Sequence, residues 1–169
     1  MNPEDQFIIH SIGHSDHTLE AFLELLRQQG IQRVVDVRSQ PYSRWVPAFN
    51  RETLARALEE AGVSYAFMGD SLGGRPADPA LYDPHDPSGR PGYARLAATE
   101  TFQAGIERLI ELAQDRPTAI MCSEGDYRQC HRGLLITPEL LARGVRVVHI
   151  QPDGETVEAR PEAQQLTLF

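Results

Sequence analysis

Two cysteines, a glutamate, a histidine and an arginine lie within eleven residues, at Cys122, Glu124, Cys130, His131 and Arg132. A helix N-terminus or a nearby guanidinium lowers the pKa of a thiol and makes it nucleophilic. We therefore expect Cys130, at the start of a predicted helix beside Arg132, to be reactive, and Cys122 to be buried and inert. Adjacent helical residues point about 100° apart, so His131 is not expected to serve as the base for Cys130. Glu124 and His131 are the candidate catalytic acid and base. The alternative for Cys130 is a small buried residue at a tight helix start.

A second set of polar residues suits an anionic ligand. Guanidinium groups bind phosphate or carboxylate in bidentate fashion. We expect the anion to be bound by His14, Ser15, Asp36, Arg38, Ser39, Arg44 and Arg132. Arg38, Arg44, Glu124, His131 and Arg132 are expected to converge on one cleft. The alternative is a network of structural pairs between arginines and the carboxylates of Asp36 and Glu124.

The thiols do not have the spacing of a metal site. Cys122, Glu124, Cys130 and His131 lack the paired C-x-x-C pattern of zinc proteins, so we expect no metal and no other cofactor. All 16 basic residues are arginines, which excludes Schiff-base catalysis by a lysine.

The elements that position these residues alternate between strand and helix. Strands are expected at residues 7–12, 31–37, 63–68, 118–122 and 145–150, with helices at about 18–29, 50–61, 99–113 and 130–142. The pattern predicts a three-layer α/β fold, a mostly parallel sheet of about five strands with helices on both faces. Ligands of such sheets collect beyond the carboxyl ends of the strands, where the candidate residues fall. Residues 69–93, with five glycines and five prolines, are expected to form a long binding loop.

Composition indicates one globular domain at residues 1–150, followed by a polar tail at 151–169. Hydrophobic residues make up 41% of the chain and charged residues 24%, as in ordinary globular proteins. The formal charge of −8 argues against attraction of nucleic acid by the whole surface. We expect a cytoplasmic protein with reduced thiols and no membrane partner, because neither a signal peptide nor a membrane-length apolar run is present.

Four short motifs follow one another along residues 7–150: Ser11-Ile12-Gly13-His14-Ser15, Asp36-Val37-Arg38-Ser39-Gln40-Pro41-Tyr42-Ser43-Arg44, Leu72-Gly73-Gly74-Arg75, and Cys122-Ser123-Glu124 leading to Cys130-His131-Arg132. Together they resemble the bacterial and archaeal "domain of unknown function 488" family, which implies an α/β fold and a shared polar site without naming a reaction. A weaker, distant likeness links the chain to rhodanese-type domains, through Val35–Arg38 and the strand-C-x5-R-helix arrangement of Cys122 and Arg128.

The last five residues look like the bacterial sliding-clamp-binding peptide, whose usual pattern is Gln-Leu-(Ser/Asp)-Leu-Phe. The resemblance implies that the DNA sliding clamp is a partner, bound by Gln165, Leu166, Leu168 and Phe169. Apolar side chains on a polar tail can enter a pocket of a partner with little prior structure to disrupt. The alternative is a C-terminal strand that packs on the domain itself.

These observations favour an enzyme that acts on a phosphate-bearing nucleotide or nucleic acid, for example in DNA repair, and that is recruited to the clamp. One alternative is a non-catalytic module that binds an anion or nucleic acid and docks on the clamp. Another is rhodanese-like thiol chemistry.

Overall fold

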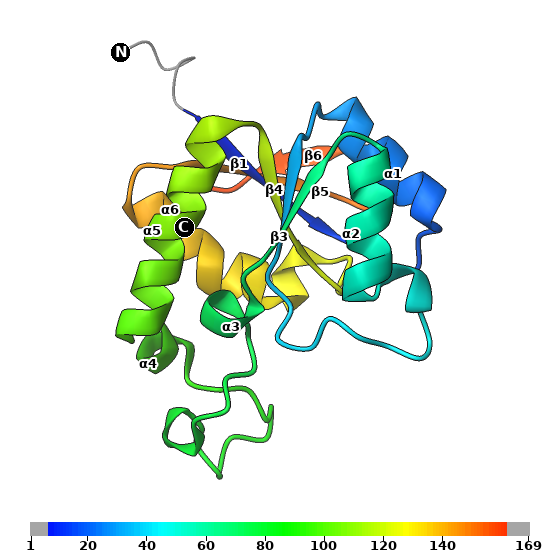
Figure 1. Cartoon of the computed structure of the whole chain (residues 1–169). Helices are drawn as coiled ribbons and strands as arrows, with labels where there is room; N and C mark the ends of the chain where they lie inside the picture. The colour runs from blue at the N-terminus through cyan, green and yellow to red at the C-terminus, as the bar shows by residue number, and fades with distance from the viewer. Residues whose placement is uncertain (1–6, 162–169) are drawn as a thin grey trace.

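A computed structural model describes residues 7–161 of the chain. They form a six-stranded sheet with helices on both faces (Figure 1). The strands lie in the order β3 (Ser64–Phe67), β2 (Arg33–Asp36), β4 (Thr118–Cys122), β1 (Ile8–Gly13), β5 (Arg146–Ile150) and β6 (Thr156–Glu158). All neighbours are parallel except β5 and β6, which are antiparallel. The predicted three-layer, mostly parallel α/β class is confirmed, and the residues expected as a tail contribute one further strand, β6.

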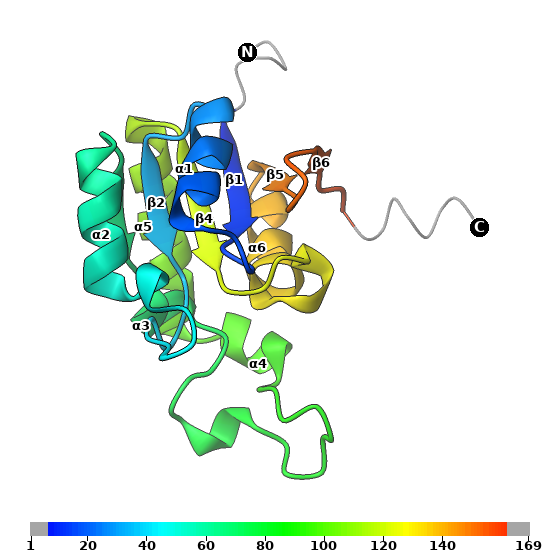
Figure 2. The ribbon, with the colours of Figure 1, turned by 90° about the vertical axis from the view of Figure 1, so that its right-hand side faces the viewer.

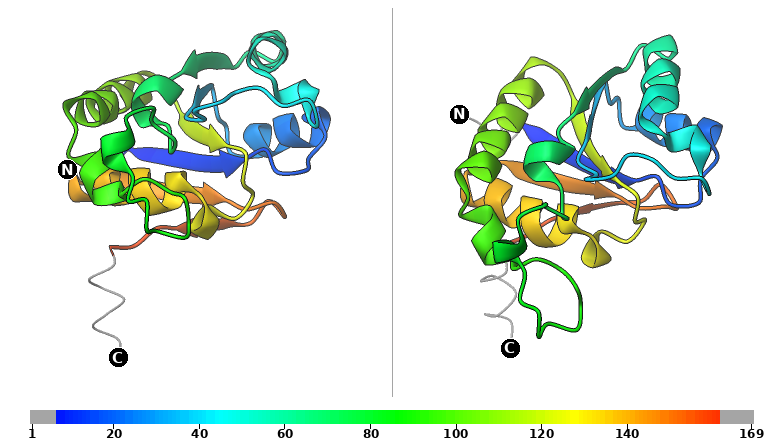
Figure 3. Two further views of the ribbon diagram at one scale, coloured as in Figure 1. Left: turned by 90° about the horizontal axis from the view of Figure 1, so that it is seen from below. Right: turned by 60° about the horizontal axis from the view of Figure 1, so that its bottom comes forward.

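The helices divide between the two faces of the sheet. On one face lie α1 (Leu19–Gln28) and α2 (Arg51–Glu60), and on the other lie α5 (Glu100–Asp115) and α6 (Thr137–Ala142) (Figures 1 and 3). Successive side chains of a strand point to opposite faces. Val34 accordingly joins the core beneath α1 and α2, whereas Val35 joins the core beneath α5 and α6. Both residues are fully buried, which fixes the register of β2 at the centre of the fold.

Short helical turns interrupt the connections on the carboxyl side of the sheet. They are η2 (Pro47–Phe49), α3 (Gly69–Leu72), η3 (Pro79–Leu81), α4 (Tyr93–Ala97), η4 (Tyr127–Gln129) and the π-helix η5 (Arg132–Ile136). The segment between α3 and α4 projects beyond the carboxyl ends of the strands (Figure 2). The predicted long loop therefore exists, with short helices at its two ends. In residues 7–161 no helix is both long and apolar enough to cross a membrane.

Candidate functional site

A hollow of about 300 Å³ lies at the carboxyl ends of β2 and β4. Three segments that are far apart in sequence form its wall: the end of β2, the projecting segment between α3 and α4, and the stretch from the end of β4 to η5. The lining residues with side chains suited to chemistry include Arg38, Ser39, Arg75, Arg90, Tyr93, Cys122, Glu124, Cys130 and His131. Ligands of parallel sheets collect at this edge.

Arg132 is fully buried beneath the hollow. Its Nε–H donates to Cys122 Sγ at 3.1 Å, and its Nη1 donates to Ser11 Oγ at 2.7 Å. Its Nη2 donates to the carbonyls of Glu124 and Gly125 at 2.9 and 3.0 Å, which holds the loop after β4 in place. Within residues 7–161 no aspartate or glutamate forms an ion pair with this guanidinium. A buried positive charge of this kind is best stabilised by an ionised neighbour, and the nearest ionisable group is the Cys122 thiol.

Cys122 is accordingly the more acidic of the two thiols. Its burial opposes ionisation, but a hydrogen bond from Cys130 and the charge of Arg132 outweigh that effect and lower the pKa of Cys122 to about 7, from an ordinary 9.0. A thiol with this pKa is substantially ionised at neutral pH, and the thiolate is the nucleophilic form.

Cys130 behaves in the opposite way. The interaction with Cys122 and burial both raise the pKa of Cys130, so this thiol keeps its proton. The burial predicted for Cys122 is confirmed, but these pKa shifts favour Cys122 rather than Cys130 as the thiolate, opposite to the prediction from the sequence. Cys130 has extended backbone angles (φ −129°, ψ 148°) and precedes the helical turn, and the guanidinium of Arg132 points back to Cys122. Cys130 nevertheless lines the hollow, so it stays a candidate for the chemistry.

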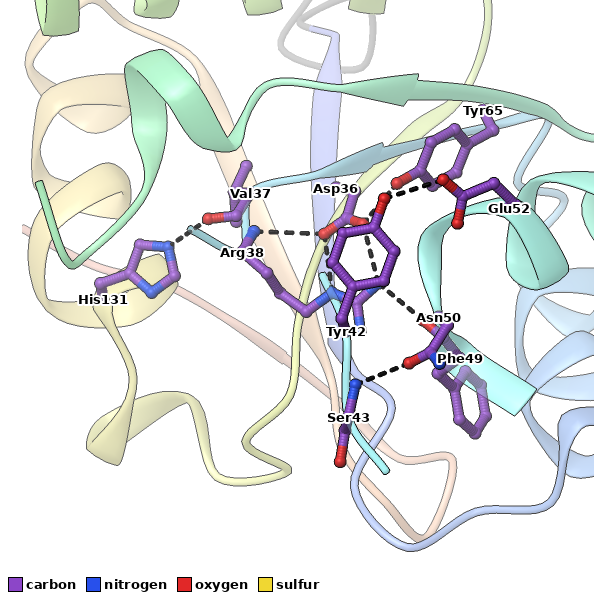
Figure 4. A network of polar contacts seen from close by, with 10 residues as sticks. All are labelled: Asp36, Val37, Arg38, Tyr42, Ser43, Phe49, Asn50, Glu52, Tyr65 and His131. Carbon is purple, nitrogen blue, oxygen red and sulfur yellow. Dashed lines mark hydrogen bonds and ion pairs between the residues drawn. The ribbon is translucent and has the colours of Figure 1, made fainter. Parts of the chain in front are cut away.

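His131 links the end of β2 to Cys130. Its Nε2–H donates to the Val37 carbonyl at 2.9 Å (Figure 4), and its Nδ1 lies 3.6 Å from Cys130 Sγ. The extended backbone of Cys130 brings the adjacent side chains together, contrary to the expectation from helical geometry. Burial lowers the pKa of His131 to about 4, so the ring is neutral at pH 7. A Cβ at Gly74 would lie 2.8 Å from His131 Cγ, so only glycine fits against this ring.

Glu124 lies at the opening of the hollow with an exposed side chain. Its Oε1 accepts the Asp126 N–H at 3.2 Å, which leaves Oε2 directed to no residue described. Its position is suited to exchange of protons between the hollow and solvent.

Asp36 and Arg38 form a buried structural pair. Oδ1 of Asp36 accepts Arg38 Nε–H at 2.9 Å, and Oδ2 accepts Nη2 at 2.8 Å. The Tyr65 hydroxyl donates to the same carboxylate, and Arg38 Nη2 also donates to the Phe49 carbonyl at 2.8 Å (Figure 4). Asp36 is fully buried and Arg38 is 6% exposed, so neither offers a free charge to a ligand. Arg38 is among the residues that line the hollow, but its pairing with Asp36 favours the alternative of a structural network.

Two other predicted anion-binding side chains make contacts outside the hollow. His14 is buried and stacks on the Phe49 ring at 4.6 Å. Arg44 is exposed, with its guanidinium 4.9 Å from the centre of the Trp45 ring. Neither residue lines the hollow, so the predicted convergence fails for Arg44.

Ser15 and Arg132 stabilise the wall through hydrogen bonds to the backbone of the loop after β4. The Ser15 N–H donates to the Ser123 carbonyl at 2.9 Å, and Arg132 is covered by the loop that it holds. Of the predicted anion-binding residues, Arg38 and Ser39 line the hollow, and Ser39 Oγ accepts the Arg75 N–H at 2.9 Å.

Two arginines that were not among the predicted site residues occupy the rim. Arg75 and Arg90 both come from the projecting segment, and Arg90 Nη2 donates to the Gln129 carbonyl at 3.3 Å. The sequence signal that could have identified these two arginines was their position in a long glycine- and proline-rich loop, which was expected to bind a ligand. Residues 7–161 hold no group of three or more histidine, cysteine or acidic side chains arranged to bind a metal ion.

Comparison with known proteins gives one match. A family model described as "Domain of unknown function DUF488" matches residues 18–137, which is more than half of the chain. No curated protein and no solved structure gives a significant match.

Proposed function

This chain belongs to the family described as domain of unknown function DUF488, and from the geometry of its site we propose that it is a thiol enzyme in which the Cys122 thiolate attacks an anionic substrate. The observation that carries the proposal is the contact of the fully buried Arg132 guanidinium with Cys122 Sγ at 3.1 Å. A buried arginine without a carboxylate partner stabilises a thiolate, as an enzyme with a cysteine nucleophile requires.

The preference for an anionic substrate rests on the rim of the hollow. Arg75 and Arg90 line it, and the guanidinium of Arg75 is exposed to solvent. An arginine can bind a phosphate or carboxylate in bidentate fashion, which would hold the substrate over the hollow that contains Cys122. Glu124 at the opening would serve as the acid or base, the role expected for it from the sequence.

An enzyme is favoured over a non-catalytic binding module by what lies inside the hollow. A module needs only the two rim arginines, whereas here two thiols and a histidine share the same wall. Titratable groups with opposed pKa shifts in one pocket are typical of catalytic sites.

The biological setting of the reaction is a proposal from the sequence. Gln165–Phe169, the clamp-like peptide, lies outside the described residues. Recruitment to the sliding clamp would bring the enzyme to DNA, and the phosphate of a nucleotide or nucleic acid would then be the anion that Arg75 and Arg90 bind.

The proposal is tested by alkylation of the Cys130→Ser variant, in which Cys122 is the only thiol and the serine hydroxyl can replace the hydrogen bond from Cys130. Rates with iodoacetate, an anion, and iodoacetamide, its neutral analogue, are divided by those of free cysteine. We expect the iodoacetate-to-iodoacetamide ratio to fall several-fold when Arg75 and Arg90 are both changed to alanine. Arg56→Ala, on the exposed surface of α2, is the matched control and should leave the ratio unchanged. Equal ratios in all three proteins would contradict anion binding at the rim.

A further inference from the structure

We propose that Cys130 is a resolving thiol, and that the substrate is an anionic disulfide whose sulfur is attacked by Cys122 and then displaced by Cys130, which closes a Cys122–Cys130 disulfide. This inference rests on the proposed function of Cys122 and names the substrate class and the second step.

The two thiols are placed for such a transfer. Cys122 ends β4 and Cys130 directly follows η4, yet both are free thiols that line the same hollow. Both residues line one hollow of about 300 Å³, and each thiol shifts the pKa of the other, so the two sulfur atoms lie near one another. Their exposed fractions are 2% and 7%, which keeps bulk solvent from an intermediate formed on Cys122.

The electrostatics of the pair impose the order of the two steps. Before the reaction, the contact with Cys122 and burial raise the pKa of Cys130, so Cys122 is the first nucleophile. When Cys122 becomes part of a mixed disulfide, its negative charge is lost and no longer opposes ionisation of Cys130. The backbone amide and the charge of Arg132 already favour ionised Cys130, and they then act without competition from a Cys122 thiolate. The formation of the intermediate therefore activates the second thiol.

Each step balances. In the first, the Cys122 thiolate forms a bond to one sulfur of the disulfide R–S–S–R, the S–S bond breaks, and R–S⁻ leaves. In the second, Cys130 forms a bond to Cys122 Sγ, the bond to the remaining R–S group breaks, and the proton of Cys130 ends on that leaving thiolate. The substrate is reduced to two thiols and the protein is oxidised by two electrons. A small dithiol or thiol reductant regenerates the pair by ordinary exchange.

The need for a sulfur-linked intermediate identifies the substrate class. If Cys122 carried an acyl or phosphoryl group, attack by Cys130 would only move that group from one thiol to the other. A group linked through sulfur is instead released by disulfide formation, so a second thiol in contact with the first has a chemical purpose. The rim arginines Arg75 and Arg90 select a disulfide that bears carboxylates or phosphates.

The test uses dithiodipropionate, a small disulfide with two carboxylates, and cystamine, a disulfide of similar size with two ammonium groups. Intact-mass analysis of the full chain after brief reaction should show the wild type losing two hydrogens and retaining no adduct, the mark of an internal disulfide. Cys130→Ser should retain one mercaptopropionate on Cys122. Cys122→Ser should react much more slowly, and cystamine should react several-fold more slowly than dithiodipropionate with the wild type.

The outcomes separate the two proposals. A stable mixed disulfide on Cys122 of the wild type would overturn the resolving role of Cys130 and leave the nucleophilic role of Cys122 intact. Reaction of Cys122→Ser as fast as the wild type would overturn the proposed function itself. Equal rates with the two disulfides would overturn selection for an anionic substrate. Gly92→Ala is a control that should behave as the wild type. Gly92 lies at the end of the projecting segment, and the added methyl group would make only ordinary contacts there.

Discussion

Replacing Arg132 by glutamine should return Cys122 to the behaviour of an ordinary thiol. In the native chain Arg132 and Cys130 lower the pKa of Cys122 to about 7, from an ordinary 9.0. At pH 7 the thiolate fraction is then about one half, whereas a thiol with a pKa near 9 would be only about 1% ionised. Loss of the guanidinium should reduce the rate of alkylation at pH 7 by up to about fifty-fold, if the whole shift depends on it.

The assay is a pH titration of thiolate absorbance together with the rate of reaction with iodoacetamide, both in the Cys130→Ser background. The rates of the two proteins should converge above pH 10, where both thiols are ionised, because the substitution changes ionisation more than access. Arg132→Lys serves as a second variant: an ammonium keeps the positive charge, so part of the pKa shift should persist. Circular dichroism establishes that each variant is folded, because Arg132 also holds the carbonyls of Glu124 and Gly125.

The reasoning would be refuted if a folded Arg132→Gln protein titrated at the same pH as its parent. The contact at 3.1 Å would then be structural, and the acidity of Cys122 would need another source.

Three further predictions concern stability and partners. Asp36→Asn should lower the free energy of unfolding by about 3–5 kcal/mol because it leaves the buried Arg38 unpaired. Asp115→Asn, at an exposed carboxylate paired with Arg33 and Arg116, should cost much less in the same urea titration. Burial lowers the pKa of His149 to about 4, so the unfolded chain takes up a proton below about pH 6.5 and the folded chain does not. The free energy of unfolding should therefore fall as the pH is lowered from 6.5 to 4. His149→Asn should remove about 1.4 kcal/mol per pH unit from that slope. An unchanged slope would show that His149 is not buried in its neutral form. Removal of Gln165–Phe169 should abolish binding to the purified clamp and leave the melting temperature unchanged, and a drop of several degrees would assign these residues to the core instead.

The strands and helices could be predicted because burial imposes simple periods on the sequence. Residues 119–122 form a continuous apolar run, and β4 is buried along its whole length at the centre of the sheet. The edge of the sheet that holds the candidate site could be predicted from the same pattern, since parallel strands bring their carboxyl ends together. By contrast, β6 is a three-residue edge strand, Thr156–Glu158, with two of its residues exposed, so it carries no such pattern.

The roles of single side chains were harder to predict because they depend on where each side chain points and which group it contacts. Arg132 lies at the first position of a π-helix and its side chain turns back beneath Cys122, which a residue count cannot reveal. Arg38 was expected to face a ligand, but the Asp36 carboxylate two residues earlier takes its guanidinium. Arg75 and Arg90 reach the hollow from a segment whose path is set by turns rather than by periodic packing.

The most direct test of the central claim is the order in which the two cysteines of the native chain react. The protein is treated at neutral pH with less than one equivalent of iodoacetamide, and each modified residue is identified by peptide mass analysis. Cys122, with Arg132 against its sulfur, should carry nearly all of the label, although it is 2% exposed and Cys130 is 7% exposed. Predominant labelling of Cys130 would contradict the account, because it would show that access rather than ionisation by Arg132 decides which thiol reacts.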